Sequence, residues 1–107
     1  MSDRILLAPT ASAANSNEFI VKPGRPITVY LYPVASLTAG EYANLQRKDP
    51  AGTWQVVFDH SFKGSGGQVI LDSTVTGITV VAEGTYRIDL DDPTNAIGVA
   101  AADTVDK

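Results

Sequence analysis

Gly84 to Leu90 reads G-T-Y-R-I-D-L, and this stretch indicates the fold more specifically than any other part of the chain. Apolar and polar residues alternate from Thr85 onwards, which places Tyr86, Ile88 and Leu90 on one side. Such alternation is the pattern of a half-buried β-strand, because successive side chains point to opposite faces of a sheet. We therefore expect a strand here, with Tyr86 in the core.

The same period of two recurs in two earlier segments. Residues 26–32 alternate, with their apolar members directed toward a core. Residues 53–59 alternate as well and place Trp54 and Phe58 on one face, so we expect both aromatic side chains in the core. Shorter runs rich in β-forming residues follow at 68–71 and 78–81.

A turn between two of these segments predicts a hairpin. Asp49, Pro50 and Gly52 occupy the positions that such residues favour in a type I turn. Residues 41–48 would also suit a helix, but this turn joins them to residues 53–59 and favours a strand.

Together these signals define the expected fold class. Turn residues recur about every ten positions, as in β-sandwiches and small barrels. Gly84 followed by Tyr86 is also typical of the corner of Ig-like sandwiches, where a tyrosine hydroxyl binds upstream backbone. We predict an all-β protein: a single antiparallel β-sandwich, Ig-like, of about seven or eight strands.

Composition excludes several classes of protein. With 107 residues, the chain suits one domain with one core. Its apolar runs are too short to cross a bilayer, and the N-terminus shows no pattern of a secretion signal. It has no cysteine and one histidine, which disfavours disulfides, thiolate chemistry and transition-metal sites. We expect no cofactor.

The net charge of −4 arises from the last quarter of the chain. Residues 82–107 hold six acids and two bases, whereas acids and bases balance in residues 1–81. No cluster of Lys and Arg could neutralise phosphates, so nucleic-acid binding is disfavoured. An acidic rim and tail would instead favour a basic protein surface.

We expect a single domain over residues 1–107, built from three parts. Residues 1–24 are predicted to form an extended N-terminal arm with the first strand or strands, and residues 25–92 the sandwich body. Residues 93–107 form an Ala/Asp-rich C-terminal tail that could be a last strand, a strand added to a neighbour, or a frayed end. Asp103 and Asp106 in this tail are candidate interface residues.

Two clusters contain residue types used in catalysis or phosphate binding. Asp59, His60 and Ser61 match a hydrolase triad in type, but adjacent strand residues point to opposite faces, and a triad needs its base between its partners. Residues 63–67 are glycine-rich with a lysine, but the order differs from that of a phosphate loop. We therefore expect no catalytic residue.

A third cluster has the oxygen atoms that calcium prefers. Asp89, Asp91, Asp92 and Asn95 lie close together in the sequence. The glycine and glutamate of an EF-hand loop are absent from the corresponding positions. The cluster is therefore consistent with an ion site and with a solvated strand end. We assign no metal ligand to it.

Three tyrosines are candidate interface residues. Tyr30 and Tyr32 alternate with the apolar positions of their segment and are expected to face outward, with Tyr42 extending the same surface. Tyrosines in such places can anchor a protein interface or stack on sugars. We favour burial in a second layer or subunit interface, with carbohydrate contact as an alternative.

Part of the chain resembles a known group of proteins. Residues 52–57 read G-T-W-Q-V-V, residues 68–71 read Q-V-I-L, and residues 84–88 read G-T-Y-R-I. With these motifs, residues 37–90 resemble short β-rich proteins encoded among phage structural genes. The resemblance implies a virion component, such as a capsid decoration protein or a tail accessory, and it implies no catalytic residue.

From the residues and the resemblance we expect a non-enzymatic virion structural protein. The first hypothesis is a capsid decoration (cement) protein on the outer surface of the head. A tail or head-completion component and a carbohydrate-binding β-sandwich module are the alternatives. Expected partners are the major capsid protein or other virion proteins and further copies of the chain, without nucleic acid or membrane. The expected location is the virion, assembled in the host cytoplasm.

Overall fold

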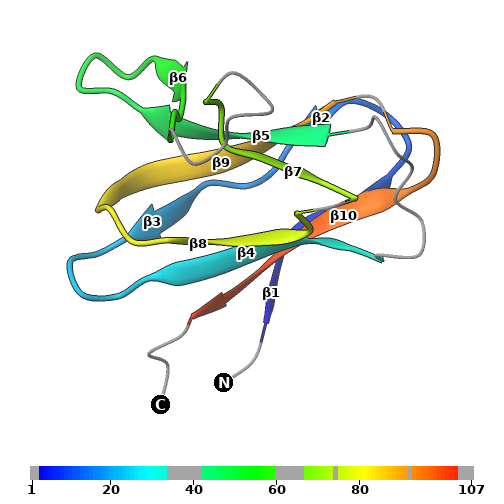
Figure 1. Ribbon diagram of the computed structural model, residues 1–107, viewed down its shortest axis with the longest axis horizontal. Coiled ribbons are helices and arrows are strands. Elements are labelled where there is room, and N and C mark those ends of the chain that lie inside the picture. The colour runs from blue at the N-terminus through cyan, green and yellow to red at the C-terminus, as the bar shows by residue number, and fades with distance from the viewer. Residues whose placement is uncertain (1–2, 34–41, 60–66, 74, 92, 104–107) are drawn as a thin grey trace.

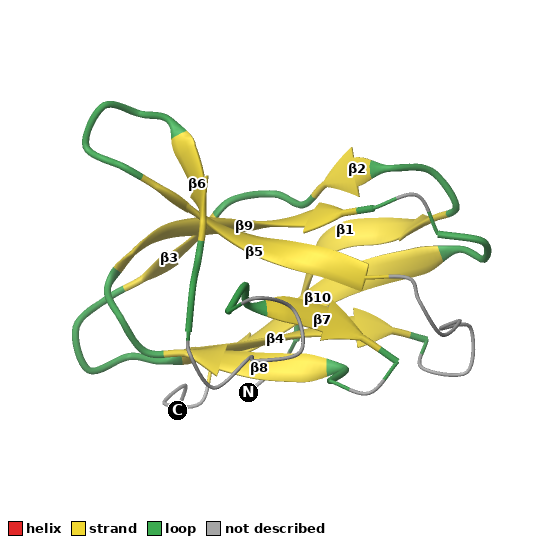
Figure 2. Ribbon diagram, turned by 45° about the horizontal axis from the view of Figure 1, so that its top comes forward, coloured by secondary structure: helices red, strands yellow, loops and turns green. Residues whose placement is uncertain are grey.

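The computed structural model describes residues 3–33, 42–59, 67–73, 75–91 and 93–103. Their ten strands form two antiparallel sheets that pack as layers (Figures 1 and 2). The predicted all-β antiparallel sandwich is therefore confirmed, with ten strands where seven or eight were expected. No helix in the described part of the chain is long and apolar enough to cross a membrane.

Each sheet combines segments that are far apart in the sequence. The four-stranded sheet has the order β1 (Arg4–Thr10), β10 (Ile97–Asp103), β4 (Ile27–Tyr32), β8 (Gly77–Val80). The six-stranded sheet has the order β2 (Ala14–Asn15), β9 (Gly84–Leu90), β5 (Tyr42–Lys48), β6 (Trp54–Val56). In addition, β3 (Phe19–Val21) pairs with β9, and β7 (Ile70–Asp72) pairs with β5.

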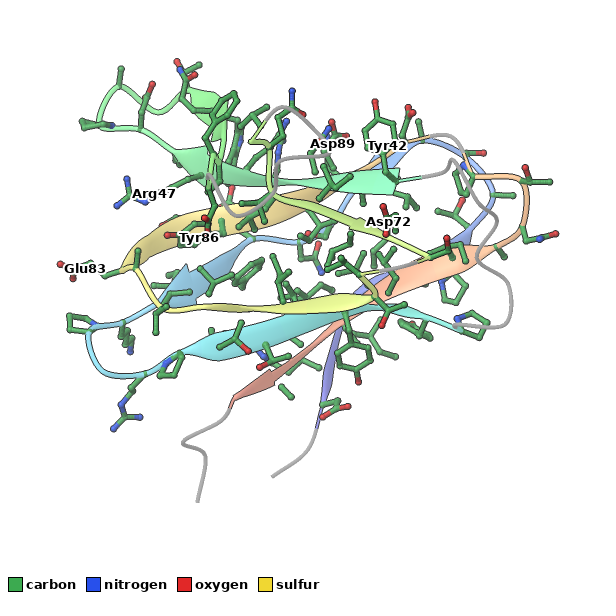
Figure 3. The ribbon with its side chains drawn as sticks, viewed as in Figure 1. Tyr42, Arg47, Asp72, Glu83, Tyr86 and Asp89 are labelled. Atoms are coloured by element: carbon green, nitrogen blue, oxygen red, sulfur yellow. The ribbon has the colours of Figure 1, made fainter. Side chains whose placement is uncertain are left out.

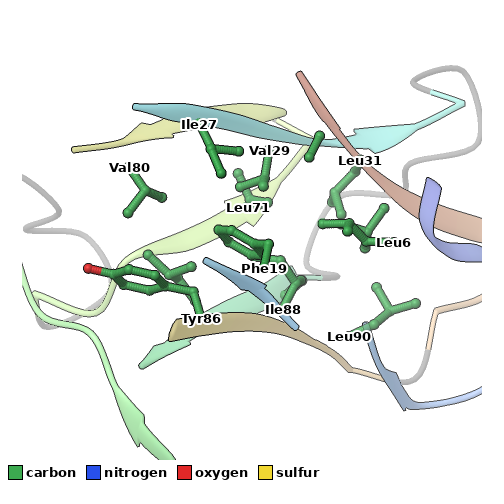
Figure 4. Packing of buried hydrophobic residues seen from close by; sticks show 14 of the residues in the cluster. Leu6, Phe19, Ile27, Val29, Leu31, Leu71, Val80, Tyr86, Ile88 and Leu90 are labelled. Atoms are coloured by element: carbon green, nitrogen blue, oxygen red, sulfur yellow. The ribbon is translucent and has the colours of Figure 1, made fainter. Parts of the chain in front are cut away.

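The core lies between the sheets and is formed by alternate residues of the strands (Figure 4). On β4, the inward positions are Ile27, Val29 and Leu31, as the alternation predicts. From the opposite sheet, β9 contributes its own alternate residues, including Ile88 and Leu90. Burial of these side chains is the main favourable term in folding, at about 1.5–3 kcal/mol for each large aliphatic group.

Tyr86 forms the predicted corner. Its side chain is 2% exposed, and its ring stacks on Phe19 with the ring centroids 5.7 Å apart. The hydroxyl donates a hydrogen bond of 2.7 Å to the carbonyl oxygen of Ala82, just before β9. A buried hydroxyl needs such a partner, so this bond fixes how the chain enters β9.

The turn after β5 also forms as predicted. The Gly52 amide donates to the Asp49 carbonyl oxygen at 2.9 Å, which closes the turn between β5 and β6. The Asp49 carboxylate accepts hydrogen bonds from the amides of Ala51 and Thr53. The hydrogen bond from the Thr53 amide is the largest cause that lowers the pKa of Asp49. Hydrogen bonds from the Gln55 side chain and the Ala51 amide lower it further.

The prediction for residues 53–59 is wrong about which face they bury. Trp54 pairs with Lys48, and Val56 pairs with Gln46. Both partners alternate with the buried residues Ala43 and Leu45 of β5, so they lie on the outer face of the sheet. The register therefore directs Trp54 outward, where it is half-buried. Beyond β6 the chain leaves regular pairing, and Phe58 is 66% exposed rather than in the core.

Of the three possibilities for the C-terminal segment, the structure shows a last strand, because residues 97–103 form β10 inside the four-stranded sheet. It pairs with β1 on one side and with β4 on the other. Val99 and Ala101 are fully buried. Asp103 ends this strand, and Asp106 lies outside the described residues. An Ig constant domain has its last strand in the other sheet, beside the strand that corresponds to β9.

The strands described before residue 25 likewise belong to the body of the sandwich. In the four-stranded sheet β1 pairs with β10 and buries Leu6. In the other sheet β3 pairs with β9 and buries Phe19 and Val21. The predicted arm is thus divided between the two layers, and the predicted division into arm, body and tail does not describe the fold.

Candidate functional site

The outer face of the four-stranded sheet is formed by the residues that alternate with its buried positions. None of these residues carries a charge, and we call this surface the uncharged face. Its members are Ile5, Thr28, Tyr30, Tyr32, Gly77, Thr79, Gly98, Ala100 and Ala102.

Small residues on β10 make room for a tyrosine on this face. Gly98 pairs with Tyr32, and a Cβ atom built on Gly98 would lie 2.8 Å from the tyrosine ring. It would also lie 2.7 Å from the carbonyl oxygen of Leu7 on the other side. The ring therefore rests on the glycine, and the Tyr32 hydroxyl is buried with no hydrogen-bond partner among the described residues.

The rest of the uncharged face offers few polar groups. The hydroxyl oxygens of Thr28 and Thr79 are 2.8 Å apart and hydrogen-bonded to each other. The Tyr30 hydroxyl donates to the Asp3 carboxylate at the margin, and this bond, more than burial, raises the pKa of Tyr30. Ile5 is 65% exposed. The face thus combines an accessible apolar side chain with hydroxyl groups that are either bonded within the chain or, for Tyr32, buried.

The outer face of the six-stranded sheet has a different chemistry, and we call it the charged face (Figure 3). Its positions follow from the pairing of β5 with β6, β7 and β9 and of β9 with β2 and β3. The members are Asn15, Ile20, Tyr42, Asn44, Gln46, Lys48, Trp54, Val56, Ile70, Asp72, Thr85, Arg87 and Asp89.

Trp54 occupies one end of the charged face together with two cations. The Arg87 guanidinium carbon lies 4.5 Å from the centre of the tryptophan ring, and the Lys48 ammonium lies 5.2 Å from it. Arg87 Nε also donates to Gln46 Oε1 at 2.7 Å, and Lys48 forms an ion pair of 3.3 Å with Glu18. Such cation–π contacts hold the ring and both charges in place.

The opposite end of the charged face carries acids. Asp89 and Asp72 lie near Tyr42, away from Arg47 at the other end of β5 (Figure 3). Lys48, Gln46 and Arg87 were not identified from the sequence. The alternation of the sequence could have identified them, because they occupy the polar positions between buried residues of β5 and β9.

The three candidate tyrosines do not form one surface. Tyr30 and Tyr32 belong to β4 on the uncharged face, whereas Tyr42 belongs to β5 on the charged face. The two faces lie on opposite sides of the sandwich. The expectation that Tyr42 extends the surface of the other two is therefore wrong.

The clusters considered for catalysis and ion binding are only partly described. His60, Ser61, Lys63 and Asp92 lie outside the described residues. Among the described residues, no group of three or more His, Cys, Asp or Glu side chains could hold a metal ion.

A cleft of about 380 Å³ opens between the two layers beside β8. Phe58 and Val81, both largely exposed, are among the residues that line it. Apolar residues line its interior, among them Leu45, Val57, Val69, Ile78 and Val80. The cleft thus brings apolar groups to the surface along one edge of the sandwich, apart from both outer faces.

These features define a small antiparallel β-sandwich with two outer faces of different chemistry. Comparison with solved structures finds a similar fold in the crystal structure of SPBc2 prophage-derived protein YomS. The TM-score is 0.61 at 13% sequence identity, and the match covers 94% of this chain and 88% of that one. No protein-family model and no curated protein sequence matches the chain. At this identity the likeness shows the fold alone.

Proposed function

We propose that this chain is a non-enzymatic structural protein of a phage particle that docks through its uncharged face. The observation that carries the proposal is the absence of charge from every strand position of that face. Antiparallel sheets that turn one face to water usually present polar residues there. An uncharged face with the exposed Ile5 at its margin is instead suited to burial against a partner.

Two lines of support favour a phage particle as the setting. The motifs at residues 52–57, 68–71 and 84–88 resemble those of phage structural proteins, and the similar fold belongs to a prophage-derived protein. The specific role we propose is capsid decoration, with the major capsid protein as partner on the outer surface of the head. A tail or head-completion component would use the same face on a different virion protein.

Carbohydrate binding is not part of the proposal. That alternative needed Tyr30, Tyr32 and Tyr42 on one surface, and they lie on opposite faces. In addition, the Tyr30 hydroxyl already binds Asp3, and the Tyr32 hydroxyl is buried.

Co-sedimentation with phage particles tests the proposal. Purified protein is mixed separately with heads that lack it and with isolated tails, and bound protein is measured after centrifugation. We expect binding to heads, and binding to tails alone would favour the second role. Failure to bind either particle would overturn the proposal.

A pair of matched variants tests which face is used. Ile5→Glu places a charge on the uncharged face, and Ile20→Glu places one on the charged face. Both isoleucines are largely exposed, so neither change should alter the fold. We expect Ile5→Glu to weaken particle binding roughly tenfold or more, because a buried unpaired charge is costly, and Ile20→Glu to leave it unchanged. Equal effects of the two variants would contradict docking through the uncharged face.

A further inference from the structure

The charged face has its acids at one end and its bases at the other. Asp72 lies beside Tyr42 at the start of β5, and Lys48 lies beside Trp54 at its end. Alternate residues of a strand are about 6.6 Å apart, so the two ends are separated by roughly 20 Å.

β9 repeats the same order. Asp89 lies opposite Asn44 of β5, and Arg87 lies opposite Gln46. The acid is therefore again nearer the start of β5, and the base is nearer its end. Along the direction of β5, the charge therefore changes from negative to positive twice: from Asp72 on β7 to Lys48 on β5, and from Asp89 to Arg87 on β9.

We infer that the charged face pairs with the same face of a second copy of the chain, with the two sheets in opposite directions. The two-fold axis lies in the plane of contact and runs perpendicular to β5. It passes midway between Asn44 and Gln46, so it sets the acidic end of each face opposite the basic end of the other. It sets Asp89 of each copy opposite Arg87 of the other. A two-fold axis along the strands would instead set the acidic end of one face against the acidic end of the other, which is unfavourable.

The same axis matches the uncharged positions of the face. Asn44 of one copy comes opposite Gln46 of the other, so an amide faces an amide. Ile70 pairs with Asn44, and Val56 pairs with Gln46, so the axis also sets Ile70 opposite Val56. The central pairs of the face, one charged, one amide and one apolar, are therefore self-complementary under one symmetry operation.

The shape of the sheet favours the same arrangement. The hairpin formed by β5 and β6 rises out of the sheet at the basic end (Figure 2). When the two copies run in opposite directions, their hairpins lie at opposite ends of the contact and do not collide. In a parallel arrangement both hairpins would occupy one end.

The inferred contact is small and polar. Strand rise and spacing give a patch of roughly 20 Å by 15 Å, less than half the size of a standard interface on each partner. We therefore expect a weak dimer, with a dissociation constant in the micromolar range or above, that weakens further as salt is added. The inference goes beyond the proposed function and does not depend on it, because the uncharged face stays accessible in this dimer.

Charge reversal tests the pairing. Sedimentation velocity at rising protein concentration measures the dimer, with Arg87→Glu, Asp89→Arg and the double variant compared with the unchanged chain. Each single reversal sets like charges against each other and should weaken the dimer roughly tenfold or more. The double variant remakes both pairs with exchanged signs and should restore it. Arg25→Glu, in the turn between β3 and β4, is the control and should have no effect; thermal unfolding confirms that each variant is folded.

Cross-linking tests the register. The chain contains no cysteine, so only introduced thiols react. Facing sheets lie about 10 Å apart, beyond the reach of a disulfide, and a short bismaleimide is therefore the reagent. We expect Asn44→Cys and Gln46→Cys to cross-link more efficiently in a mixture of the two variants than either variant does alone, because the mixed pair is directly opposite across the contact. A monomer at all concentrations, a dimer that the charge reversals leave unchanged, or cross-linking of Asn44→Cys alone as efficient as that of the mixture would each overturn the inference.

Discussion

The two outer faces of the sandwich arise from the same alternation of residues, yet they differ in how they are filled. On the uncharged face the middle strand β10 presents only Gly98, Ala100 and Ala102, and tyrosines of the neighbouring β4 lie beside these small residues. On the charged face β5 and β9 present long polar side chains such as Gln46, Lys48 and Arg87, and the Trp54 ring is in contact with two cations. The alternation of side chains along each strand therefore determines which residues point outward, whereas the size and charge of those residues determine what the face can bind.

The largest effect is expected on the uncharged face, from Gly98→Ala. The added methyl group would meet the Leu7 carbonyl oxygen and the Tyr32 ring at 2.7–2.8 Å, and the carbonyl oxygen belongs to backbone. We expect the free energy of unfolding, measured with urea, to fall by about 2–3 kcal/mol.

Gly24→Ala is the matched control for that measurement. Nothing lies within 4 Å of the added group, and only the backbone angle φ of +72° disfavours alanine. We expect a loss of about 1 kcal/mol there. If Gly98→Ala cost no more than Gly24→Ala, the close packing described for the uncharged face would be wrong.

An intermediate effect is expected on the charged face, from Trp54→Ala. The half-buried ring contacts Arg87 and Lys48, and each cation–π contact contributes about 0.5–1 kcal/mol at a partly exposed site. We expect unfolding to become easier by about 1–2 kcal/mol. Phe58→Ala is the aromatic control: its side chain is exposed, and a change within about 0.5 kcal/mol is expected. A larger loss for Phe58→Ala would contradict the outward placement of that residue.

The smallest effects are changes of stability with pH, and they have opposite signs at Tyr30 and Asp49. The pKa of Tyr30 is raised by its bond to Asp3, so the folded state favours the neutral phenol. That contribution to stability is complete below the ordinary tyrosine pKa of 10.0 and is lost as the pH rises through the raised value. We expect the difference in Tm between the unchanged chain and Tyr30→Phe to shrink in strongly alkaline buffer; a constant difference would contradict the bond.

Asp49, in the hairpin that bears Trp54, should behave in the opposite way. Its pKa is lowered, so its contribution is complete above the ordinary value of 3.8 and is lost as the pH falls through the lowered value. Asp49→Asn keeps an acceptor oxygen for the turn but removes the charge. We expect the difference in Tm between the two chains to disappear in strong acid, and a difference that persists there would show that the charge is not its source.

Much of the fold could be predicted from local pattern. Gly84 to Leu90 and residues 26–32 alternate clearly, and Asp49 to Gly52 have the residues of their turn, so these elements form as expected. The place of β10 could not be read in this way, because Gly and Ala have low strand propensity and do not identify a neighbour. Its small residues make sense only beside Tyr30 and Tyr32, which lie more than sixty positions earlier.

The candidate surfaces were harder to predict than the strands. Trp54 and Phe58 were expected inside because apolar residues alternate around them. The buried face of a hairpin strand is set by register with its partner, and a shift of one residue exchanges the two faces. For Trp54, the polar partners Lys48 and Gln46 on β5 decide the matter. Likewise, Tyr30 and Tyr42 could be placed on separate surfaces only once the two sheets were known.

The position of β10 has a consequence for how the protein is made. Because β10 lies between β1 and β4, these two strands lack their common neighbour until residues 97–103 have left the ribosome. The N-terminal strand must therefore wait through the synthesis of nearly ninety further residues before it can pair. Contacts between such distant segments are slow to form, so we expect the four-stranded sheet to close only after translation has passed this point.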